Sequence, residues 1–285
     1  MLEPEVERQV ERLDAGVRGR LRESLFQRLF ENLRAPGASV DRVVTLNAQF
    51  RMHRTLGAFV SRCFYDGILE SPRPDEEFAH ALPGYEGVHA AWIDVPNGRG
   101  AESGKRSKRR RAEARVIADQ LERLLPSAPD LTFGVISFYS DQVDEIWREL
   151  VARDLARRTD QGYELVRGLQ YDAGGRRLDR LHVGSVDAFQ GKEFDVVFLS
   201  TTRSSPPAGP PPAGAAHDRW VRRRYGHLTL RNRLCVAMSR QKRLLVTVGD
   251  AAMFEGPAAP AQVGPLTEFL RLCRSGGEHG TVLSP

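Results

Sequence analysis

The chain has 285 residues, of which 41% are hydrophobic, and its 42 lysines and arginines exceed its 37 aspartates and glutamates to give a net charge of +5. That apolar content suffices for a sizeable core, and the basic balance slightly favours an anionic partner such as nucleic acid. The charged N-terminus, the absence of a membrane-length apolar run and three scattered cysteines without zinc spacing lead us to expect a cytoplasmic protein with no membrane contact and no metal site of its own.

The first 36 residues have the periodicity of helices. Apolar residues recur every three or four positions from Val6 to Leu33, which predicts two helices broken near Gly16. A short buried strand is predicted at 43–46, and a helix after His53 is closed by a turn at Asp66.

From there on, strands alternate with helices. Strands are predicted at 88–95, 132–137, 195–199 and 244–248, and helices at 114–125, 138–155, 230–240 and 266–272. This alternation predicts an α/β fold with a doubly wound, mostly parallel sheet covered on both faces. Ligand-binding residues of such sheets gather beyond the carboxyl ends of strands. Because segments 49–53, 137–142 and 190–193 each follow a predicted strand, we expect them to meet along one edge.

Three segments interrupt the alternation. Residues 157–180 form a polar insert, with a small hairpin expected around 163–166. Residues 204–216 are too rich in proline to pack as a helix or strand, and an arginine-rich patch follows at 219–224. We expect a flexible tail at 276–285.

A basic run, K-R-S-K-R-R-R, occupies positions 105–111 and leads into a predicted helix. Positive charge at the start of a helix opposes the helix dipole, at a cost of about 0.3–1 kcal/mol per charge. The conflict indicates an anionic partner, although a solvated loop explains the run equally well.

The turn Q-G-K-E at 190–193 lies between two apolar segments and places an acid and a base beside Gly191. It suits a ligand that carries phosphates and hydroxyls, but it is not a P-loop, since Glu193 stands where Ser or Thr is required. No G-x-x-x-x-G-K-[ST] pattern occurs anywhere in the chain.

Four motifs now stand in one order along the chain. They are Q-F-R-M-H at 49–53, I-S-F-Y-S-D-Q at 136–142, V-G-S-V-D-A-F-Q-G-K-E-F-D-V-V at 183–197 and R-L-C-V-A-M-S-R-Q-K-R at 233–243. Over about residues 22–255 the chain resembles the second RecA-like domain of superfamily 1 helicases of the Upf-like, 5′-to-3′ branch. The resemblance implies a RecA-like helicase C-terminal domain at 37–275 that lacks the P-loop. Residues 1–36 would be the linker from a first RecA-like domain.

The resemblance also assigns an ATP site. Arg51 and Arg240 match the two arginines that reach the γ-phosphate, where a planar, permanently charged guanidinium suits the charge that develops during phosphoryl transfer. Glu193 matches the acid that binds ribose hydroxyls, and Phe50 matches an aromatic residue that packs on adenine or ribose. The predicted nucleotide contacts are thus Gln49, Phe50, Gly191 and Glu193. The alternative is that Arg51 and Arg240 are ordinary surface arginines and that Phe50 is a core residue.

A nucleic-acid groove is implied by the same resemblance. Ser137, Tyr139, Gln142, Ser185 and Asp187 match positions along it, although short polar residues at strand ends also serve as caps. The expected ligand is single-stranded DNA or RNA. Two departures from the family pattern are Cys235, where Asn is common, and Arg110, where Asn often stands ahead of Glu113.

Two functions are compatible with these residues. The first is the C-terminal motor domain of an ATP-dependent DNA or RNA helicase. It would use ATP and Mg²⁺ only with a P-loop-containing first RecA-like domain, in cis or in trans, and the isolated chain would be inactive. The second is a non-catalytic remnant that binds nucleic acid or protein. Retention of both arginines and Glu193 favours the first, because catalysis needs them and binding alone does not.

Overall fold

The computed structural model describes residues 29, 32, 33, 46–171, 175–204, 211–276 and 279–285. The chain divides into the units Met1–Leu46 and Asn47–Pro285, and the second is described below. Helical backbone is described in the first unit at Leu29, Asn32 and Leu33. The remainder of the predicted N-terminal helices, and all but Leu46 of the strand predicted at 43–46, lie outside the described residues.

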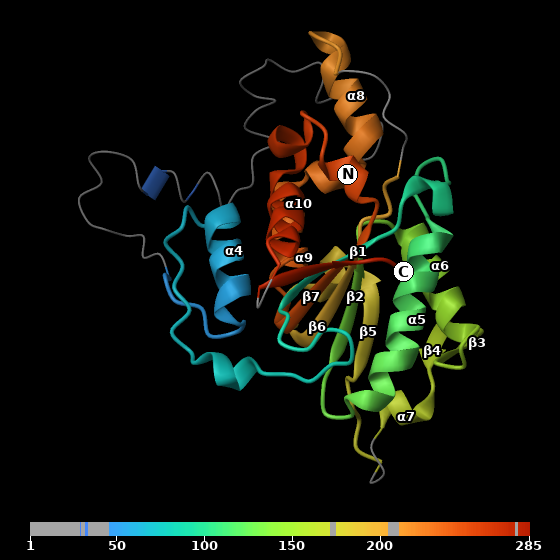
Figure 1. Ribbon diagram of the computed structural model, residues 1–285. Coiled ribbons are helices and arrows are strands. Elements are labelled where there is room, and N and C mark those ends of the chain that lie inside the picture. Colours follow the sequence, from blue (N-terminus) through green and yellow to red (C-terminus); the bar gives the residue numbers. More distant parts are fainter. Residues whose placement is uncertain (1–28, 30–31, 34–45, 172–174, 205–210, 277–278) are drawn as a thin grey trace. The chain divides into compact units, whose positions relative to one another are not determined.

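Within the described residues, six strands form one sheet in the order β5-β2-β6-β7-β1-β8, and neighbouring strands are parallel (Figure 1). The central strands are nearly continuous apolar runs, as a sheet buried on both faces requires. The predicted doubly wound, RecA-like sheet is therefore confirmed. The strands are β1 (Ala90–Asp94), β2 (Phe133–Ser137), β5 (Leu181–Ser185), β6 (Phe194–Ser200), β7 (Gln241–Gly249) and β8 (Gly280–Leu283).

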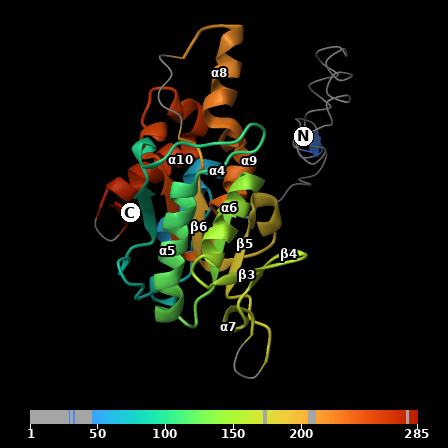
Figure 2. The same cartoon turned by 90° about the vertical axis from the view of Figure 1, so that its right-hand side faces the viewer.

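Helices cover both faces of the sheet (Figures 1 and 2). On one face, α5 (Arg111–Ser127) and α6 (Ser140–Val151) bury apolar residues such as Ile117 and Ile146 against the strands. The other face packs against α4 (Arg54–Phe64), α9 (Arg231–Ala237) and α10 (Ala259–Arg274). In the described part of the chain, no helix combines the length and apolar character needed to cross a membrane.

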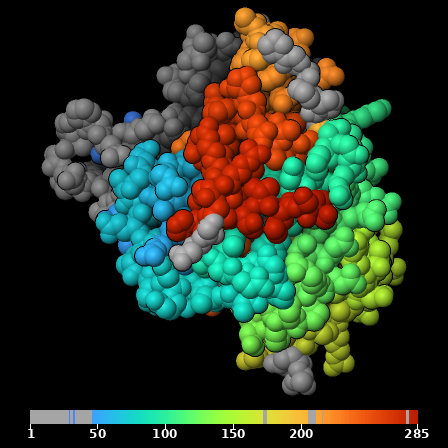
Figure 3. Space-filling model, viewed as in Figure 1, coloured from blue at the N-terminus to red at the C-terminus, as the bar shows by residue number. Residues whose placement is uncertain are grey.

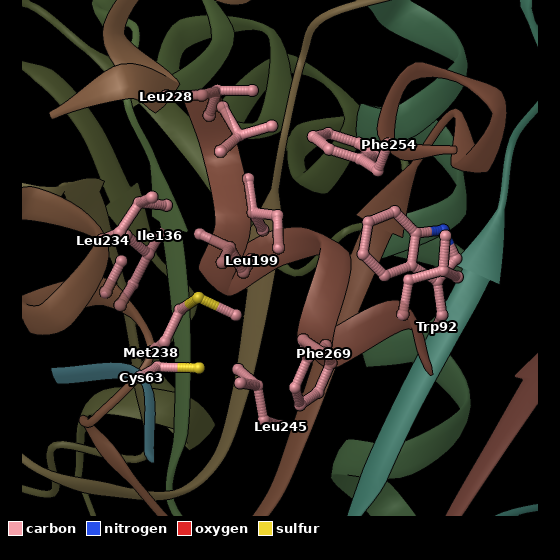
Figure 4. Close-up of a cluster of buried hydrophobic side chains, with 14 of the residues drawn as sticks. Cys63, Trp92, Ile136, Leu199, Leu228, Leu234, Met238, Leu245, Phe254 and Phe269 are labelled. Carbon is pink, nitrogen blue, oxygen red and sulfur yellow. The ribbon is translucent and has the colours of Figure 1, made fainter. Parts of the chain in front are cut away.

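The larger core lies on the α4, α9 and α10 face. Trp92 of β1 and Phe254 pack edge to face with ring centroids 5.2 Å apart, and Phe269 of α10 lies near Leu245 of β7 (Figure 4). Met238 extends this cluster toward α9, and it is fully buried. These packed side chains fix the loops that carry polar motif residues at both ends of the strands.

Three predicted segments differ from expectation or are refined. Residues 280–283 are not a flexible tail, because β8 pairs with β1 and buries one edge of the sheet. The polar insert begins with an antiparallel hairpin, β3 (Ala156–Thr159) and β4 (Gly162–Leu165), followed by α7 (Arg167–Gln170). The loop predicted at 204–216 gives way to α8 (Ala215–Tyr225), which carries the arginine-rich patch, while 205–210 lie outside the described residues.

The three motif segments do not meet along one edge, and this expectation is wrong. Residues 137–142 follow the carboxyl end of β2, whereas Glu193 immediately precedes the amino end of β6. His53 N donates to Lys242 O near the amino end of β7. After Ser185, a short 3-10 helix (Val186–Phe189) packs into the core as the chain returns to the start of β6. The 49–53 and 190–193 segments therefore share the amino-end edge, opposite 137–142.

Candidate functional site

The segment from Gln49 to His53 is a tight turn held by the Gln49 side chain. Gln49 Oε1 accepts hydrogen bonds from Arg51 N at 2.9 Å and Met52 N at 2.8 Å, and Nε2 donates to Met52 O at 2.8 Å and to Ser71 Oγ at 2.7 Å. Both donors and the acceptor of the amide are thus used within the protein. Gln49 thus sets the direction in which Arg51 leaves the turn, and its contact with a nucleotide stays a prediction.

Arg51 joins three segments that are far apart in the sequence. Its Nε lies 3.0 Å from Glu193 Oε2, and its Nη1 donates to Ser239 O at 2.8 Å. About a third of the side chain is exposed, at 30%. The guanidinium is therefore oriented by protein contacts while one side still faces solvent.

Arg240 lies on the same edge, in the turn between α9 and β7. Its Nε donates to Val236 O at 3.0 Å and its Nη2 to Ser239 Oγ at 2.9 Å. Burial, and secondly the positive charge of Arg51, lower the pKa of Arg240. Two guanidinium groups held close enough to repel each other are stabilised by an anion shared between them.

Glu193 is the acidic centre of this edge. Oε1 lies 2.9 Å from Lys242 Nζ and Oε2 lies 3.0 Å from Arg51 Nε, and these two hydrogen bonds, that of Lys242 foremost, lower the pKa of Glu193. The side chain is 45% exposed, so its remaining lone pairs face solvent. Gly191 adopts a φ of +80° in the same turn. Apart from its chain neighbours, no atom of the described residues lies within 4 Å of the position that a Cβ would take there. A ligand can approach the backbone at Gly191.

Arg51, Glu193 and Lys242 border a surface hollow of about 400 Å³. Phe50 lies at its rim with 60% of its surface exposed, so it is not a core residue. Sequence reasoning missed three cations of the lining. Lys242 and Arg243 could have been found, because they belong to the motif at 233–243. Arg73 lies in an irregular segment outside every motif, so nothing in the sequence points to it. The lining residues are Phe50, Arg51, Arg73, Glu77, Phe78, Glu193, Asp195, Lys242 and Arg243.

This donor set fits part of a nucleoside triphosphate. The cations suit phosphate oxygens, the Glu193 carboxylate can accept from sugar hydroxyls, and the exposed Phe50 ring offers an apolar surface to a base or sugar. Within the described part of the chain, no three His, Cys, Asp or Glu side chains are placed to hold a metal ion. The residues that line the hollow can form one side of a nucleotide-binding site.

The carboxyl-end edge is built differently, around a buried ion pair. Arg110 Nη1 lies 3.1 Å from Glu113 Oε1, and neither side chain is exposed to solvent. Burial raises the pKa of Glu113, the opposing effect of Arg110 coming second. Glu113 Oε2 also accepts from Ser200 Oγ at 2.7 Å and from Thr202 N at 2.8 Å.

Glu113 thereby holds the chain as it leaves β6. Thr202 has a φ of +66°, a conformation that costs a β-branched residue about 1–3 kcal/mol and persists only where neighbouring contacts enforce it. Arg110 takes part through bonds from Nη2 to Val95 O at 2.7 Å and Pro96 O at 2.8 Å. Arg110, which stands where the family often has Asn, is therefore buried with its guanidinium group hydrogen-bonded within the fold.

Three residues predicted to line a nucleic-acid groove lie inside this network. Gln142 is fully buried and bonds Arg110 N at 2.6 Å and Ser200 Oγ at 3.0 Å. Ser137 is also fully buried, and Tyr139 is 4% exposed with its hydroxyl accepting from His227 N at 3.1 Å. Their side chains are enclosed by the protein, where they support the loops at this edge of the sheet.

The other two predicted groove residues are accessible. Ser185 is half-buried at the end of β5, opposite Ser137 in register, and Asp187 is exposed. Asp187 Oδ2 lies 2.9 Å from Arg233 Nη2, which ties the turn after β5 to α9. The structure thus separates the five residues into buried and accessible groups.

Comparison with known proteins agrees with this architecture. A family model described as "AAA domain" matches residues 21–252. Similar proteins include the putative helicase MOV-10 of Gallus gallus, 28% identical over 257 residues that cover 83% of this chain and 23% of the relative. The putative regulator of nonsense transcripts 1 of Takifugu rubripes is 30% identical over 234 residues, which cover 79% of this chain and 18% of that relative. The DNA polymerase alpha-associated DNA helicase A of Saccharomyces cerevisiae is 25% identical over 232 residues, which cover 75% of this chain and 29% of that relative.

The chain spans less than a third of the length of each of these relatives. The family match nevertheless covers most of this chain, and the motif order and the parallel sheet agree with it. The chain belongs to the AAA domain family, as a helicase C-terminal domain of the Upf-like superfamily 1 type.

Proposed function

We propose that this chain is the C-terminal motor domain of an ATP-dependent DNA or RNA helicase. It would complete an ATP site whose P-loop and magnesium ligands come from a first RecA-like domain, in cis or in trans. The observation that carries the proposal is that Arg51, Arg240 and Glu193 come from three distant segments to one edge of the sheet. Arg51 and Glu193 line the hollow there, and Arg240 Nη1 donates to Lys192 O, next to Glu193, at 3.4 Å.

Arg51 and Arg240 have the properties of arginine fingers. Both are anchored by backbone carbonyls, Ser239 O for Arg51 and Val236 O for Arg240, so their positively charged ends are oriented before a ligand arrives. Preorganised charge of this kind stabilises a transferring phosphoryl group without a reorganisation cost. ATP with Mg²⁺ would supply the phosphoryl group and part of the charge neutralisation.

Glu193 has a second role in the proposal. Its bond to Lys242 holds one carboxylate oxygen in place while its bond to Arg51 competes with any anion that approaches Arg51. Nucleotide binding would draw Arg51 toward phosphate and leave the second oxygen available to a ribose hydroxyl. The same glutamate would thus keep the finger neutralised until substrate arrives.

The test is ATP hydrolysis by this chain together with a P-loop domain of the same helicase type, with and without a single-stranded oligonucleotide. We expect no hydrolysis by the chain alone. Arg240→Ala should lower the stimulated rate by about 10³-fold or more, as loss of an arginine finger does. Arg158→Ala is the matched control, because Arg158 is an exposed arginine on β3, far from the hollow in sequence and fold.

An Arg240→Ala rate equal to that of Arg158→Ala would overturn the catalytic proposal and leave the non-catalytic binding remnant. A second measurement is calorimetry of the isolated chain with ATP. We expect little or no binding, because the chain supplies only one wall; micromolar affinity would contradict the proposal that a separate domain provides the phosphate cradle.

A further inference from the structure

The basic run at 105–111 separates into residues with structural partners and residues without them. Arg110 is buried in the Glu113 network, and Arg111 Nε lies 2.8 Å from Glu149 Oε1. Lys108 Nζ donates to Gly104 O at 2.8 Å. The remaining three, Lys105, Arg106 and Arg109, are exposed and have no side-chain partner among the residues that the structure describes.

These three residues project from a defined hairpin, residues 103–109, which we call the basic hairpin. Ser103 and Arg109 exchange backbone hydrogen bonds of 2.8 and 3.0 Å, and Gly104 turns the chain with a φ of +100°. A Cβ at Gly104 would lie 2.2 Å from Ser107 O, so the turn is closed tightly. The unpaired charges therefore sit on an ordered turn rather than on a solvated loop of no fixed form.

The basic hairpin is fastened to the carboxyl-end edge of the sheet. Ser107 Oγ accepts from Asp141 N at 3.0 Å and lies 3.2 Å from Ser140 Oγ, at the start of α6. At its base, Glu102 Oε2 accepts from Arg203 Nε at 2.8 Å. The hairpin thus flanks the edge to which the buried groove residues Ser137, Tyr139 and Gln142 belong.

The helix α8 is tied to the base of the basic hairpin. Arg203 connects the two, because it pairs with Glu102 at the base of the basic hairpin and also donates to Arg223 O in α8. Figures 2 and 3 show the segment around residues 100–110 projecting beside α8. Arg219, Arg222 and Arg223 of α8 are exposed and also have no side-chain partner in the described part of the chain.

The basic hairpin and α8 thus carry six exposed cations without a side-chain partner among the described residues. The nearby acids Glu145 and Glu149, which line a hollow with Arg109, are already paired with Arg111, Arg148 and Arg153. Glu102 is already paired with Arg203 and Lys108, and Asp218 is the one exposed acid within the described turns of α8. Mutual repulsion of such a group is relieved by a polyanion, whose condensed counterions are released on binding.

We propose that the basic hairpin and α8 form a clamp for the sugar–phosphate backbone of a single-stranded nucleic acid, with Lys105, Arg106 and Arg109 contacting phosphates. The proposal rests on the proposed helicase function, since the strand is the helicase substrate. Contact through phosphates makes binding independent of base sequence. A strand bound in this way would need no contact with the three buried motif residues.

The test is the affinity of the full chain for a fluorescent single-stranded oligonucleotide, measured by anisotropy between 50 and 200 mM salt. The variant replaces Lys105, Arg106 and Arg109 with Ala. We expect affinity to fall by about tenfold to hundredfold at low salt, and the salt slope to fall by about two, at ~0.7 per lost phosphate contact. The matched control replaces Arg158, Arg167 and Arg177, three exposed arginines of the insert, and should bind like the parent.

Lysine labelling gives an independent measurement. The sequence holds only the lysines Lys105, Lys108, Lys192 and Lys242, so acetylation at each can be followed by mass spectrometry. The oligonucleotide should protect Lys105 and leave Lys242, at the opposite edge, unprotected. Equal labelling of Lys105 with and without oligonucleotide would overturn the clamp.

The outcomes separate this proposal from the proposed function. Suppose that the triple variant has the same oligonucleotide affinity and the same salt dependence as the control, while Arg240→Ala abolishes ATP hydrolysis. The clamp is then wrong and the motor function stands. If the hairpin variant loses binding while Arg240→Ala leaves hydrolysis unchanged, the clamp stands and the catalytic role fails. Failure of the parent chain to bind any oligonucleotide overturns the clamp.

Discussion

The two ends of the central sheet use the same residue types for different purposes. At the amino end, Glu193 pairs with Arg51 and Lys242, and its side chain is 45% exposed to solvent. At the carboxyl end, Glu113 pairs with Arg110 with no exposure at all. Both are glutamate–arginine pairs adjacent to helicase motifs, yet one is accessible to a ligand and the other is part of the core.

The difference shows that two similar ion pairs can have different structural roles in one domain. Surface ion pairs contribute about 0–1 kcal/mol to stability, so Arg51 can separate from Glu193 at small cost. Removing one member of a buried pair leaves an uncompensated charge and costs several kcal/mol. The amino end is thus available for exchange of partners, and the carboxyl end is a rigid support.

The comparison is tested most strongly by Glu113→Ala. The change leaves the Arg110 guanidinium buried without its carboxylate and releases Ser200 and Thr202, so we expect a loss of about 3–5 kcal/mol in the free energy of unfolding. Urea denaturation followed by circular dichroism measures it. Glu164, whose side chain is 42% exposed and pairs with Arg157, is the control. A loss no larger for Glu113→Ala than for Glu164→Ala would contradict the assignment of Glu113 as a buried support.

The next effect is a pH dependence that arises beside the amino end. His53 stacks on His89 with ring centroids 3.5 Å apart and lies 3.2 Å from Asp75, and burial foremost lowers the pKa of His53 from 6.5 to about 4. Because the folded pKa lies below the unfolded one, this contribution to stability is present above pH 6.5 and is lost as the pH falls toward 4. We expect a decrease on the order of 2 kcal/mol between pH 7 and 5.

Thermal melts across this pH range measure the effect. His53→Asn is the informative variant, since Asn can still cap α4 by accepting from Thr55 N as His53 Nδ1 does at 3.3 Å. The variant should show a shallower fall in melting temperature on acidification. An unchanged pH profile would show that His53 does not account for the acid sensitivity.

A smaller effect is expected for Gly104→Ala in the basic hairpin. The substitution strains a backbone at φ +100° and brings a Cβ against Ser107 O, which should cost about 1–2 kcal/mol and weaken oligonucleotide binding by displacing Lys105 and Arg106. Gly98→Ala is the control, because nothing lies within 4 Å of its Cβ position. Chemical denaturation and anisotropy measure the two effects, and equal behaviour of both variants would argue against an ordered hairpin.

The smallest stability effect is expected for Glu193→Ala. Its ion pairs with Arg51 and Lys242 are exposed, so the free energy of unfolding should change by less than about 1 kcal/mol. A loss as large as that of Glu113→Ala would remove the contrast between the two ends. In the presence of a P-loop domain, the same variant should raise the KM for ATP more than that for 2′- and 3′-deoxy analogues, which steady-state kinetics can resolve.

Much of the fold could be predicted from periodicity. The alternation of apolar strands with amphipathic helices determined the α/β class and most elements of 47–285, because burial on both faces demands that pattern. The tail was mispredicted, since residues 280–283 form a strand only because β1 offers them an unpaired edge. The helix α8 was missed because its many arginines conceal a weak apolar stripe.

The order of four motifs was enough to predict the family, and the family resemblance predicted that Phe50, Arg51, Glu193 and Arg240 belong to one site. Which motif segments share an edge of the sheet, and which motif residues are accessible, depended on the tertiary structure. Gln142 and Asp187 are both polar and both follow strands, yet one is enclosed by Arg110 and Ser200 and the other faces solvent. Burial depends on neighbours contributed by distant segments, and a local pattern carries no record of them.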